Sequence, residues 1–277
     1  MTPRAAGHNV APTERSVGRE SVRAAVGPVW GLAEKAIIVT GATSGIGAQI
    51  ARALGAAGAS VALVGRDAAR MAEVKGDVED GGGTTLEIVA DLEDPAAPAS
   101  IIGAVVAGFG GIDGMVHCAS LFEPLPLPDT TPESFERQLR VNVIAPFSMT
   151  QAALDHLRPD SSIVFLASTI ALVGFPMCSA YTATKGATVS MARAFAIELA
   201  PLKVRVNTIA PGYVYTPMLQ PSLDAFPGYH ESIIEKTPIG RIAEPHEIAT
   251  SVLFLLSGLS ANIDGATIVS DGGWTAQ

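Results

Sequence analysis

Tyr181 and Lys185 are separated by three residues in the segment Tyr181-Thr182-Ala183-Thr184-Lys185. If this segment is helical, side chains four residues apart project from the same helix face. A phenol has an ordinary pKa of about 10, and a neighbouring ammonium group stabilises the phenolate. The pair is therefore suited to proton transfer at a reacting oxygen, with Lys185 expected to lower the pKa of Tyr181.

A second segment with chemical potential is the glycine-rich stretch Thr40-Gly41-Ala42-Thr43-Ser44-Gly45-Ile46-Gly47. Glycines at this spacing let a backbone approach a pyrophosphate, which then faces the N-terminus of the following helix. The alternative is a tight turn that needs glycine only for its own backbone geometry. The segment lies between an expected strand and an expected helix, and this order favours a nucleotide site.

The elements that position these residues alternate between short β-rich runs and longer helical segments, as is typical of a parallel sheet with crossover helices. We expect strands at 36–40, 60–64, 85–90, 112–118, 161–167, 203–209 and 267–270. The predicted fold class is α/β, a single Rossmann-type doubly wound parallel sheet of about seven strands with helices on both faces. Residues 1–30 are expected to form a flexible N-terminal extension, and residues 31–277 the Rossmann domain.

Two later segments carry apolar residues at helical spacing, as expected for buried helix faces or subunit interfaces. These residues are Phe135, Leu139, Val143 and Phe147 in one long helix, and Val189, Phe195 and Leu199 in another.

The composition excludes several classes of protein. The 277 residues carry a net charge of −9, which disfavours nucleic-acid binding. Two cysteines cannot form a disulfide framework, and no run of about twenty apolar residues could span a bilayer. His246-Glu247 begins like a zinc-protease helix, but Thr250 occupies the position of the required second histidine. We therefore expect a cytoplasmic protein with no metal, nucleic-acid or membrane partner.

The glycine loop, the Tyr-x-x-x-Lys pair and the separation between them resemble the short-chain dehydrogenase/reductase family over residues 34–277, and in particular carbonyl reductases similar to 3-oxoacyl-carrier-protein reductases. The resemblance implies four catalytic residues. Ser168 would orient the substrate oxygen, Tyr181 would transfer its proton, and Lys185 would hold the nicotinamide ribose. Asn142 would hold a water of a proton relay through its backbone carbonyl.

The local sequence offers a reason for that last role. Pro146 lies four residues after Asn142 and has no N–H, so in a helix the carbonyl of Asn142 would lose its usual partner and be free for water. A proline kink that serves only packing is the alternative.

The resemblance also implies a set of residues that contact the cofactor. They are Gly41, Thr43, Ser44, Gly45, Ile46, Gly47, Arg66, Asp91, Leu92, Cys118, Ala119, Asn142, Tyr181, Lys185, Pro211, Gly212, Val214 and Thr216. One departure stands among them. Where the family usually has Asn-Asn-Ala-Gly, this chain has His117-Cys118-Ala119-Ser120, and we expect altered hydrogen bonding there, with His117 structural.

Gly65 and Arg66, which follow the second expected strand, indicate which of NAD and NADP the protein prefers. Relatives that prefer NAD usually have a carboxylate at the first position, which accepts hydrogen bonds from the ribose and would repel the 2′-phosphate of NADP. Arg66 could instead pair with that phosphate. We therefore expect NADP(H) to be preferred, with NAD(H) possible and a solvated surface arginine as the alternative.

The function that follows is interconversion of a ketone and a secondary alcohol by hydride transfer. Alternatives are an NAD(H)-dependent alcohol dehydrogenase and a non-catalytic nicotinamide-binding regulatory protein on the same fold. A hydrophobic substrate is expected, contacted by residues 218–229 and by Thr169, Ala171, Phe175, Met177 and Tyr213. The resemblance further implies a homo-oligomer, a tetramer or dimer, with Trp274 placed either in a subunit contact or against its own subunit.

Overall fold

The computed structural model describes residues 29–277, so most of the predicted N-terminal extension lies outside the described residues. Trp30, the second described residue, packs against the hydrophobic core. The sheet it adjoins has seven strands, in the spatial order β3-β2-β1-β4-β5-β6-β7. They are β1 (Ala36–Thr40), β2 (Ser60–Gly65), β3 (Thr84–Val89), β4 (Ile112–His117), β5 (Leu157–Leu166), β6 (Arg205–Pro211) and β7 (Thr267–Ser270). Every pair is parallel, which confirms the predicted fold class.

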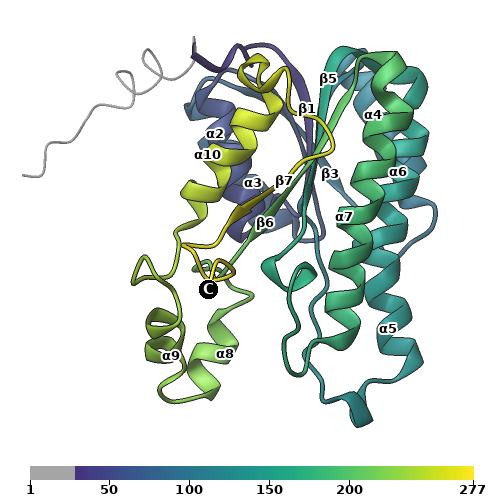
Figure 1. Cartoon of the computed structure of the whole chain (residues 1–277). Coiled ribbons are helices and arrows are strands. Elements are labelled where there is room, and N and C mark those ends of the chain that lie inside the picture. The colour runs from purple at the N-terminus through teal and green to yellow at the C-terminus, as the bar shows by residue number, and fades with distance from the viewer. Residues whose placement is uncertain (1–28) are drawn as a thin grey trace, which may run out of the picture.

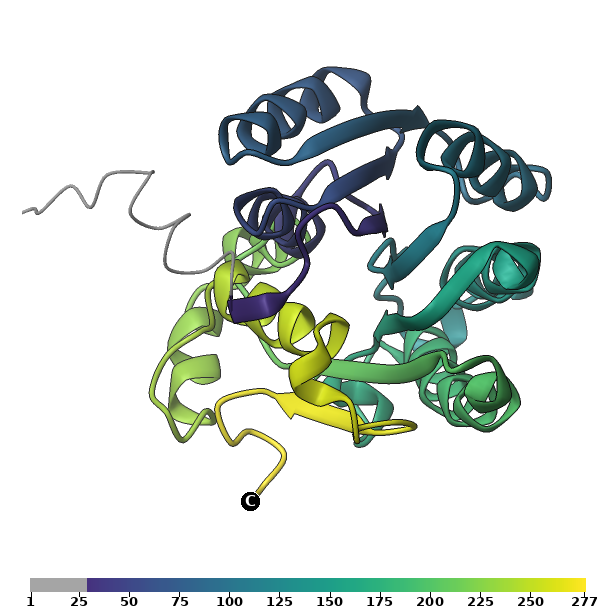
Figure 2. The same cartoon turned by 90° about the horizontal axis from the view of Figure 1, so that it is seen from above.

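Helices cover both faces of the sheet, as Figures 1 and 2 show. One face carries α2 (Gly45–Ala56), α3 (Ala68–Asp80) and α10 (Pro245–Leu256), and the other carries α4 (Ala97–Phe109), α6 (Ala145–Ala153) and α7 (Ser179–Leu199). α5 (Pro132–Leu139) precedes α6. The short helices α8 (Gln220–Ala225) and α9 (Tyr229–Glu235) lie beyond the carboxyl ends of the strands.

The core is built by alternation along apolar strands, because successive side chains of a strand point to opposite faces. Ile37 and Val39 of β1 belong to the cluster under α2 and α10, whereas Ile38 belongs to the cluster under α4, α6 and α7. All three are buried. The continuous apolar runs of the sequence are therefore central strands covered on both sides.

The strand order reverses at β1, which pairs with β2 on one side and β4 on the other. In open α/β sheets, ligands bind in the crevice at the carboxyl ends of the strands beside this switch point. The glycine loop follows β1, and the segment Cys118–Ser120 follows β4, so both of the segments singled out from the sequence meet there.

The long helix predicted around Phe135 and Phe147 is interrupted. A π-helical turn, Arg140–Ile144, separates α5 from α6, and the amide of Ala145 donates to the carbonyl of Arg140. The predicted buried stripe is wrong for the single chain, because Phe147 is 43% exposed, and the residues that are buried include Val141 and Met149 instead. The later stripe of Val189, Phe195 and Leu199 is buried as predicted.

Candidate functional site

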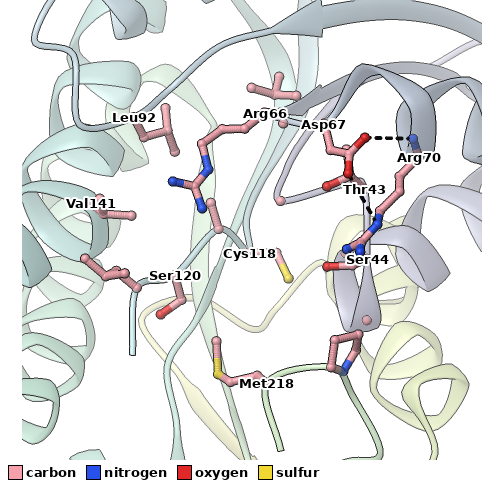
Figure 3. Close-up of a pocket in the computed structure, with 18 of the residues that line it drawn as sticks. Thr43, Ser44, Arg66, Asp67, Arg70, Leu92, Cys118, Ser120, Val141 and Met218 are labelled. Carbon is pink, nitrogen blue, oxygen red and sulfur yellow. Dashed lines mark hydrogen bonds and ion pairs between the residues drawn. The ribbon is translucent and has the colours of Figure 1, made fainter. Parts of the chain in front are cut away.

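A cleft of about 760 Å³ opens at the switch point, where residues that follow β1, β2, β3 and β4 converge (Figure 3). Twelve of the predicted cofactor residues line it: Gly41, Thr43, Ser44, Gly45, Ile46, Gly47, Arg66, Asp91, Leu92, Cys118, Ala119 and Thr216. Residues that were not predicted to contact the cofactor also line it, among them Arg70, Ser120 and Met218.

The glycine loop packs so closely against neighbouring backbone that a side chain at Gly41 or Gly47 would not fit. Gly41 has φ +69°, and a Cβ there would lie 2.9 Å from the backbone of Ala119. A Cβ on Gly47 would lie 2.2 Å from the carbonyl oxygen of Gly41. The loop therefore keeps an open cradle in front of the N-terminus of α2, where backbone N–H groups and the helix dipole favour a phosphate. The residues present fit a dinucleotide.

Two guanidinium groups lie at the outer rim of this cleft. Arg66 points across the cleft in Figure 3, 68% exposed and 3.9 Å from the carboxylate of Asp91. Arg70 pairs with Asp67 at 3.3 Å, and Asp67 also accepts a hydrogen bond from the backbone N–H of Arg70 as the N-cap of α3. The carboxylate of Asp67 is thus already partnered, while Arg66 is held only loosely.

A second, smaller cavity of about 190 Å³ adjoins the cleft, and Ile46, Thr216 and Met218 line both. Tyr181 and Ser168 line this cavity, as do the predicted residues Pro211, Gly212 and Val214. An aromatic wall includes Phe122, Phe175, Tyr213, Tyr229 and Trp274.

The aromatic wall is held together by ring contacts. The ring of Trp274 lies 6.2 Å from that of Tyr213 and 6.3 Å from that of Phe175. Trp274 is therefore anchored on its own subunit. Of the predicted substrate contacts, Thr169, Phe175 and Tyr213 line the cavity, but Ala171 and Met177 do not. Ala171 packs into a small apolar cluster, and Met177 is 46% exposed.

Tyr181 and Lys185 lie on one face of α7, with the Lys185 Nζ atom 5.4 Å from the centre of the Tyr181 ring. Nζ donates a hydrogen bond of 2.7 Å to the carbonyl of Leu166. Burial lowers the pKa of Lys185 to about 8 and raises the pKa of Tyr181 to about 12. Desolvation of the phenol thus outweighs the acidification expected from Lys185.

Asn142 is buried in the π-helical turn, and Pro146, four residues on, has no N–H to donate to its carbonyl. The hydroxyl of Thr188 lies 3.4 Å from this carbonyl but 3.0 Å from that of Thr184, and its single proton favours the shorter contact. The carbonyl of Asn142 therefore receives no hydrogen bond from the amide four residues on and only a long contact from Thr188. Neither Asn142 nor Lys185 lines the two cavities; both are buried behind Tyr181.

The side chain of Asn142 makes contacts that the sequence did not reveal. Its Oδ1 accepts from the backbone N–H of Leu121 at 2.7 Å, and its Nδ2 donates to the carbonyl of Leu121 at 2.9 Å and to the hydroxyl of Thr184 at 3.1 Å. Asn142 therefore ties the loop after β4 to the helix that carries Tyr181.

The loop that contains the departure His117-Cys118-Ala119-Ser120 is held to β1 by hydrogen bonds from its backbone amides. The amides of Cys118 and Ala119 both donate to the hydroxyl of Thr40 at 3.1 Å. His117 is buried and stacked on Phe165 with ring centres 4.6 Å apart, and burial lowers its pKa to about 3. It is neutral near pH 7, which agrees with the structural role expected of it.

Residues 29–277 contain no group of three or more His, Cys, Asp or Glu side chains that could hold a metal ion. None of the helices among these residues is long and apolar enough to cross a membrane.

Known proteins resemble this chain over most of its length. Residues 41–275 match the family model described as Enoyl-(Acyl carrier protein) reductase. A cyclopentanol dehydrogenase of a Comamonas species is 32% identical over 246 residues, covering 88% of this chain and 98% of the relative. A 2,5-dichloro-2,5-cyclohexadiene-1,4-diol dehydrogenase of Sphingobium indicum is 34% identical over 250 residues, with the same two coverages.

Solved structures agree with these relatives. A putative short-chain alcohol dehydrogenase from Sinorhizobium meliloti superposes with a TM-score of 0.86 at 33% identity, covering 90% of this chain and all of that one. A short-chain dehydrogenase from Burkholderia cenocepacia in complex with NADP gives a TM-score of 0.83 at 31% identity, covering 88% of this chain and 99% of that one. The chain belongs to the short-chain dehydrogenase/reductase family, and it is an oxidoreductase of alcohol and carbonyl groups.

Proposed function

We propose that this enzyme interconverts a small, uncharged carbocyclic secondary alcohol and its ketone, with NADP(H) as the preferred cofactor. The observation that carries the proposal is the junction of the two cavities. A cleft that fits a dinucleotide opens beside an apolar cavity lined by Tyr181 and Ser168. The cofactor supplies or accepts the hydride when it is bound.

The residues of the chain supply the proton chemistry and the positioning. Ser168 holds the substrate oxygen by its hydroxyl, and Tyr181 gives that oxygen its proton during reduction or takes it during oxidation. Lys185 holds the nicotinamide ribose and favours the phenolate of Tyr181. The backbone carbonyl of Asn142 holds a water that links Lys185 to solvent. These roles follow the family resemblance. They are supported by the positions of Ser168 and Tyr181 in the lining of the cavity and by the burial of Tyr181, Lys185 and Asn142.

The substrate class follows from the size and lining of the smaller cavity. A cavity of about 150 Å³ lined by apolar side chains can bind benzene, so the 190 Å³ observed here suits a five- or six-membered ring. None of the described residues that line it is charged, so a carboxylate or phosphate on the substrate would be buried without a partner. The relatives named for cyclopentanol and for a cyclohexadienediol support the same class.

We predict that cyclohexanone and cyclopentanone will be reduced with a higher kcat/KM than charged acyl thioesters, sugars or steroids. Truncation of the aromatic wall by Trp274→Ala should move the preference toward larger ketones, because it enlarges the cavity. The measurement is oxidation of NADPH, followed by its absorbance, over a panel of ketones. Equal activity on the small rings and the charged thioesters would contradict the proposed substrate class, and failure to oxidise NADPH with any ketone would contradict the proposed function.

The proposed cofactor preference is supported by a steric conflict at the end of β2. A Cβ on Gly65 would lie 2.6 Å from the Cγ2 atom of Thr43. Any side chain at position 65 therefore requires Thr43 to move, which disfavours the carboxylate that NAD-preferring relatives usually have there. Arg66 is an exposed, loosely paired cation at the same rim, and exposed ion pairs of this kind contribute little, so it is free to turn toward a 2′-phosphate.

We expect Arg66→Ala to lower kcat/KM for NADPH by about 10- to 100-fold, since a hydrogen bond to a charged group contributes about 1.5–3 kcal/mol. The value for NADH should change little. Arg52→Ala is the matched control, because Arg52 pairs with Asp77 outside the cleft. A clear advantage for NADH in the native enzyme would refute the assignment.

The converse variant shifts the preference toward NAD(H), and the steric conflict dictates its design. Gly65→Asp with Arg66→Ile introduces the carboxylate and removes the cation, but the new side chain would collide with Thr43. Adding Thr43→Ala leaves only the Cβ of residue 43, whose present position lies 3.5 Å from the new Cβ. We expect the triple variant to accept NADH better than the double variant does.

The proposed homo-oligomer is supported by apolar side chains that the single chain leaves uncovered along α6 and the turn before it. Phe147 and Ile144 are 43% and 54% exposed. Pairing of this face with a second subunit would bury these apolar side chains, which the single chain leaves exposed.

A further inference from the structure

Ser120 occupies the position at which the family usually has glycine, and its hydroxyl lies among the catalytic groups. The Oγ atom is 3.2 Å from the Oδ1 atom of Asn142 and 3.5 Å from the phenol oxygen of Tyr181. A glycine could make neither contact. The substitution therefore places an additional proton-bearing group beside the atom to which the proposed function assigns proton transfer.

The direction of the first contact is fixed by the hydrogen bonds of Asn142. The Nδ2 group donates to the carbonyl of Leu121 and to Thr184, while Oδ1 accepts from the amide of Leu121. Thr184 donates its own proton to the carbonyl of Tyr181 at 2.8 Å, so it can only accept from Asn142. The Oδ1 atom is thus an acceptor, and Ser120 must donate to it.

Ser120 has one proton and two acceptors within reach. While Tyr181 is a neutral phenol, the shorter contact to Asn142 is the better hydrogen bond. Once Tyr181 loses its proton, its oxygen carries a negative charge, and hydrogen bonds to charged acceptors are roughly twice as strong as neutral ones. Rotation about the Cβ–Oγ bond then turns the proton of Ser120 from Asn142 toward Tyr181.

None of the other described groups near Tyr181 donates a hydrogen bond to its phenol oxygen, so the donor on Ser120 is important. Within residues 29–277, Ser120 is the one hydrogen-bond donor to the phenol oxygen. Lys185 is 5.4 Å from the ring centre and donates its hydrogen bond to the carbonyl of Leu166. Burial raises the pKa of Tyr181, whereas the contact with Ser120 lowers it.

We propose that Ser120 is a further residue of the proton-transfer site, whose hydroxyl donates to Asn142 when Tyr181 is protonated and to Tyr181 when it is a phenolate. The proposal rests on the proposed role of Tyr181. Ser120 would therefore stabilise the phenolate form of Tyr181, which is the form that accepts a proton during alcohol oxidation. In the opposite direction, the hydroxyl returns to Asn142 as Tyr181 regains its proton.

The first test reads the ionisation of Tyr181 without turnover. The chain has four tyrosines, so ¹³Cζ-tyrosine NMR resolves them, and Tyr181→Phe identifies the signal of Tyr181. With saturating NADP⁺, Ser120→Ala should raise the pKa of Tyr181 by about one unit. At a given pH, the ratio of phenolate to phenol would then be about tenfold lower. Ser120→Gly should give the same shift, and Ser120→Thr, which keeps the hydroxyl, should restore the native titration.

The second test is the pH profile of alcohol oxidation with NADP⁺. Because the phenolate is the active form, kcat/KM rises with pH through the pKa of Tyr181, and loss of the donor should move this rise to higher pH by about one unit. Ser134→Ala is the matched control, since it removes a hydroxyl that donates to Glu123 outside the two cavities. Its profile should be native.

The two tests separate the possible failures. If neither the NMR titration of Tyr181 nor the pH profile of kcat/KM shifts in Ser120→Ala and Ser120→Gly, the proposed role of Ser120 is wrong. An equal fall of kcat/KM at every pH would not rescue it, because a structural defect would cause the same fall. A shifted NMR titration in an enzyme that turns over no alcohol would support the contact and refute the proposed function instead.

Discussion

Tyr181→Phe should lower turnover by at least about 10²-fold, the usual contribution of a positioned general acid or base, while binding of NADPH is retained. Phenylalanine keeps the ring, which lies 4.8 Å from that of Phe122 and beneath the ammonium of Lys185, so the packing of α7 should be preserved. Only the proton at the substrate oxygen is lost. The measurements are steady-state turnover and cofactor affinity on the same preparations.

Tyr215→Phe is the matched control for this prediction. Its hydroxyl contacts His230, and the residue lines neither the cofactor cleft nor the apolar cavity, so activity should stay native. Near-native turnover in Tyr181→Phe would overturn the assignment of the proton-transfer group. A loss of cofactor binding in that variant would show instead that the substitution had disturbed the cleft.

Gly47→Ala should weaken cofactor binding by more than about tenfold, which corresponds to 1.4 kcal/mol or more. The new Cβ would lie 2.2 Å from the carbonyl oxygen of Gly41, a backbone atom that cannot swing away. The first turn of α2 must therefore move relative to the glycine loop, and the cradle for the phosphates is lost. Titration with NADPH and thermal unfolding would measure the two consequences.

The control for Gly47 is another helical glycine with open space around it. A Cβ on Gly103 in α4 would meet no atom within 4 Å, so Gly103→Ala should leave cofactor binding unchanged and stabilise the fold by about 0.5–1 kcal/mol. Native affinity in Gly47→Ala would contradict the view that the loop must pack this closely.

The strands were predictable because their apolar runs are short, β-branched and separated by helical segments. β1 and β7 have the predicted bounds, whereas β5 begins at Leu157, four residues before its predicted start. The start of β5 contains Arg158 and Pro159, whose composition is unlike that of a buried strand. Leu157 pairs with Ile112, and the register shifts before the next pair, Gly114 with Ser162, which no local sequence pattern indicates.

The burial of the stripe around Phe147 could not be predicted because a π-helical turn is not visible in the spacing of apolar residues. Such a turn inserts one extra residue, which rotates the following helix by about 100°. Val143 and Phe147 are then displaced from the buried face, and Ala145 and Met149 take their place. Pro146 was the visible signal that the helix is irregular here.

Most of the candidate site could be predicted because its residues follow strand ends or share one helix face. What the sequence could not show is which side chains meet across the switch point. The steric exclusion between Thr43 and Gly65 joins two loops that are distant in the sequence, as does the contact of Ser120 with Tyr181. Arg70 had a local signal, because it lies one helical turn after Arg66, on the helix that begins beside it.

The segment that holds α8 and α9 is nearly independent of the folding core. No residue of α8 is buried, and Ile233 is the single buried residue of α9, yet Met218, Leu219, Ser222 and Tyr229 line the apolar cavity. Both helices lie beyond the sheet in Figure 1. Substitutions here can reshape the cavity without opening voids between strands and helices. The substrate range can therefore diverge among descendants of this chain with little loss of stability. The cofactor cleft, which is built from the loops after β1 to β4, need not change with it.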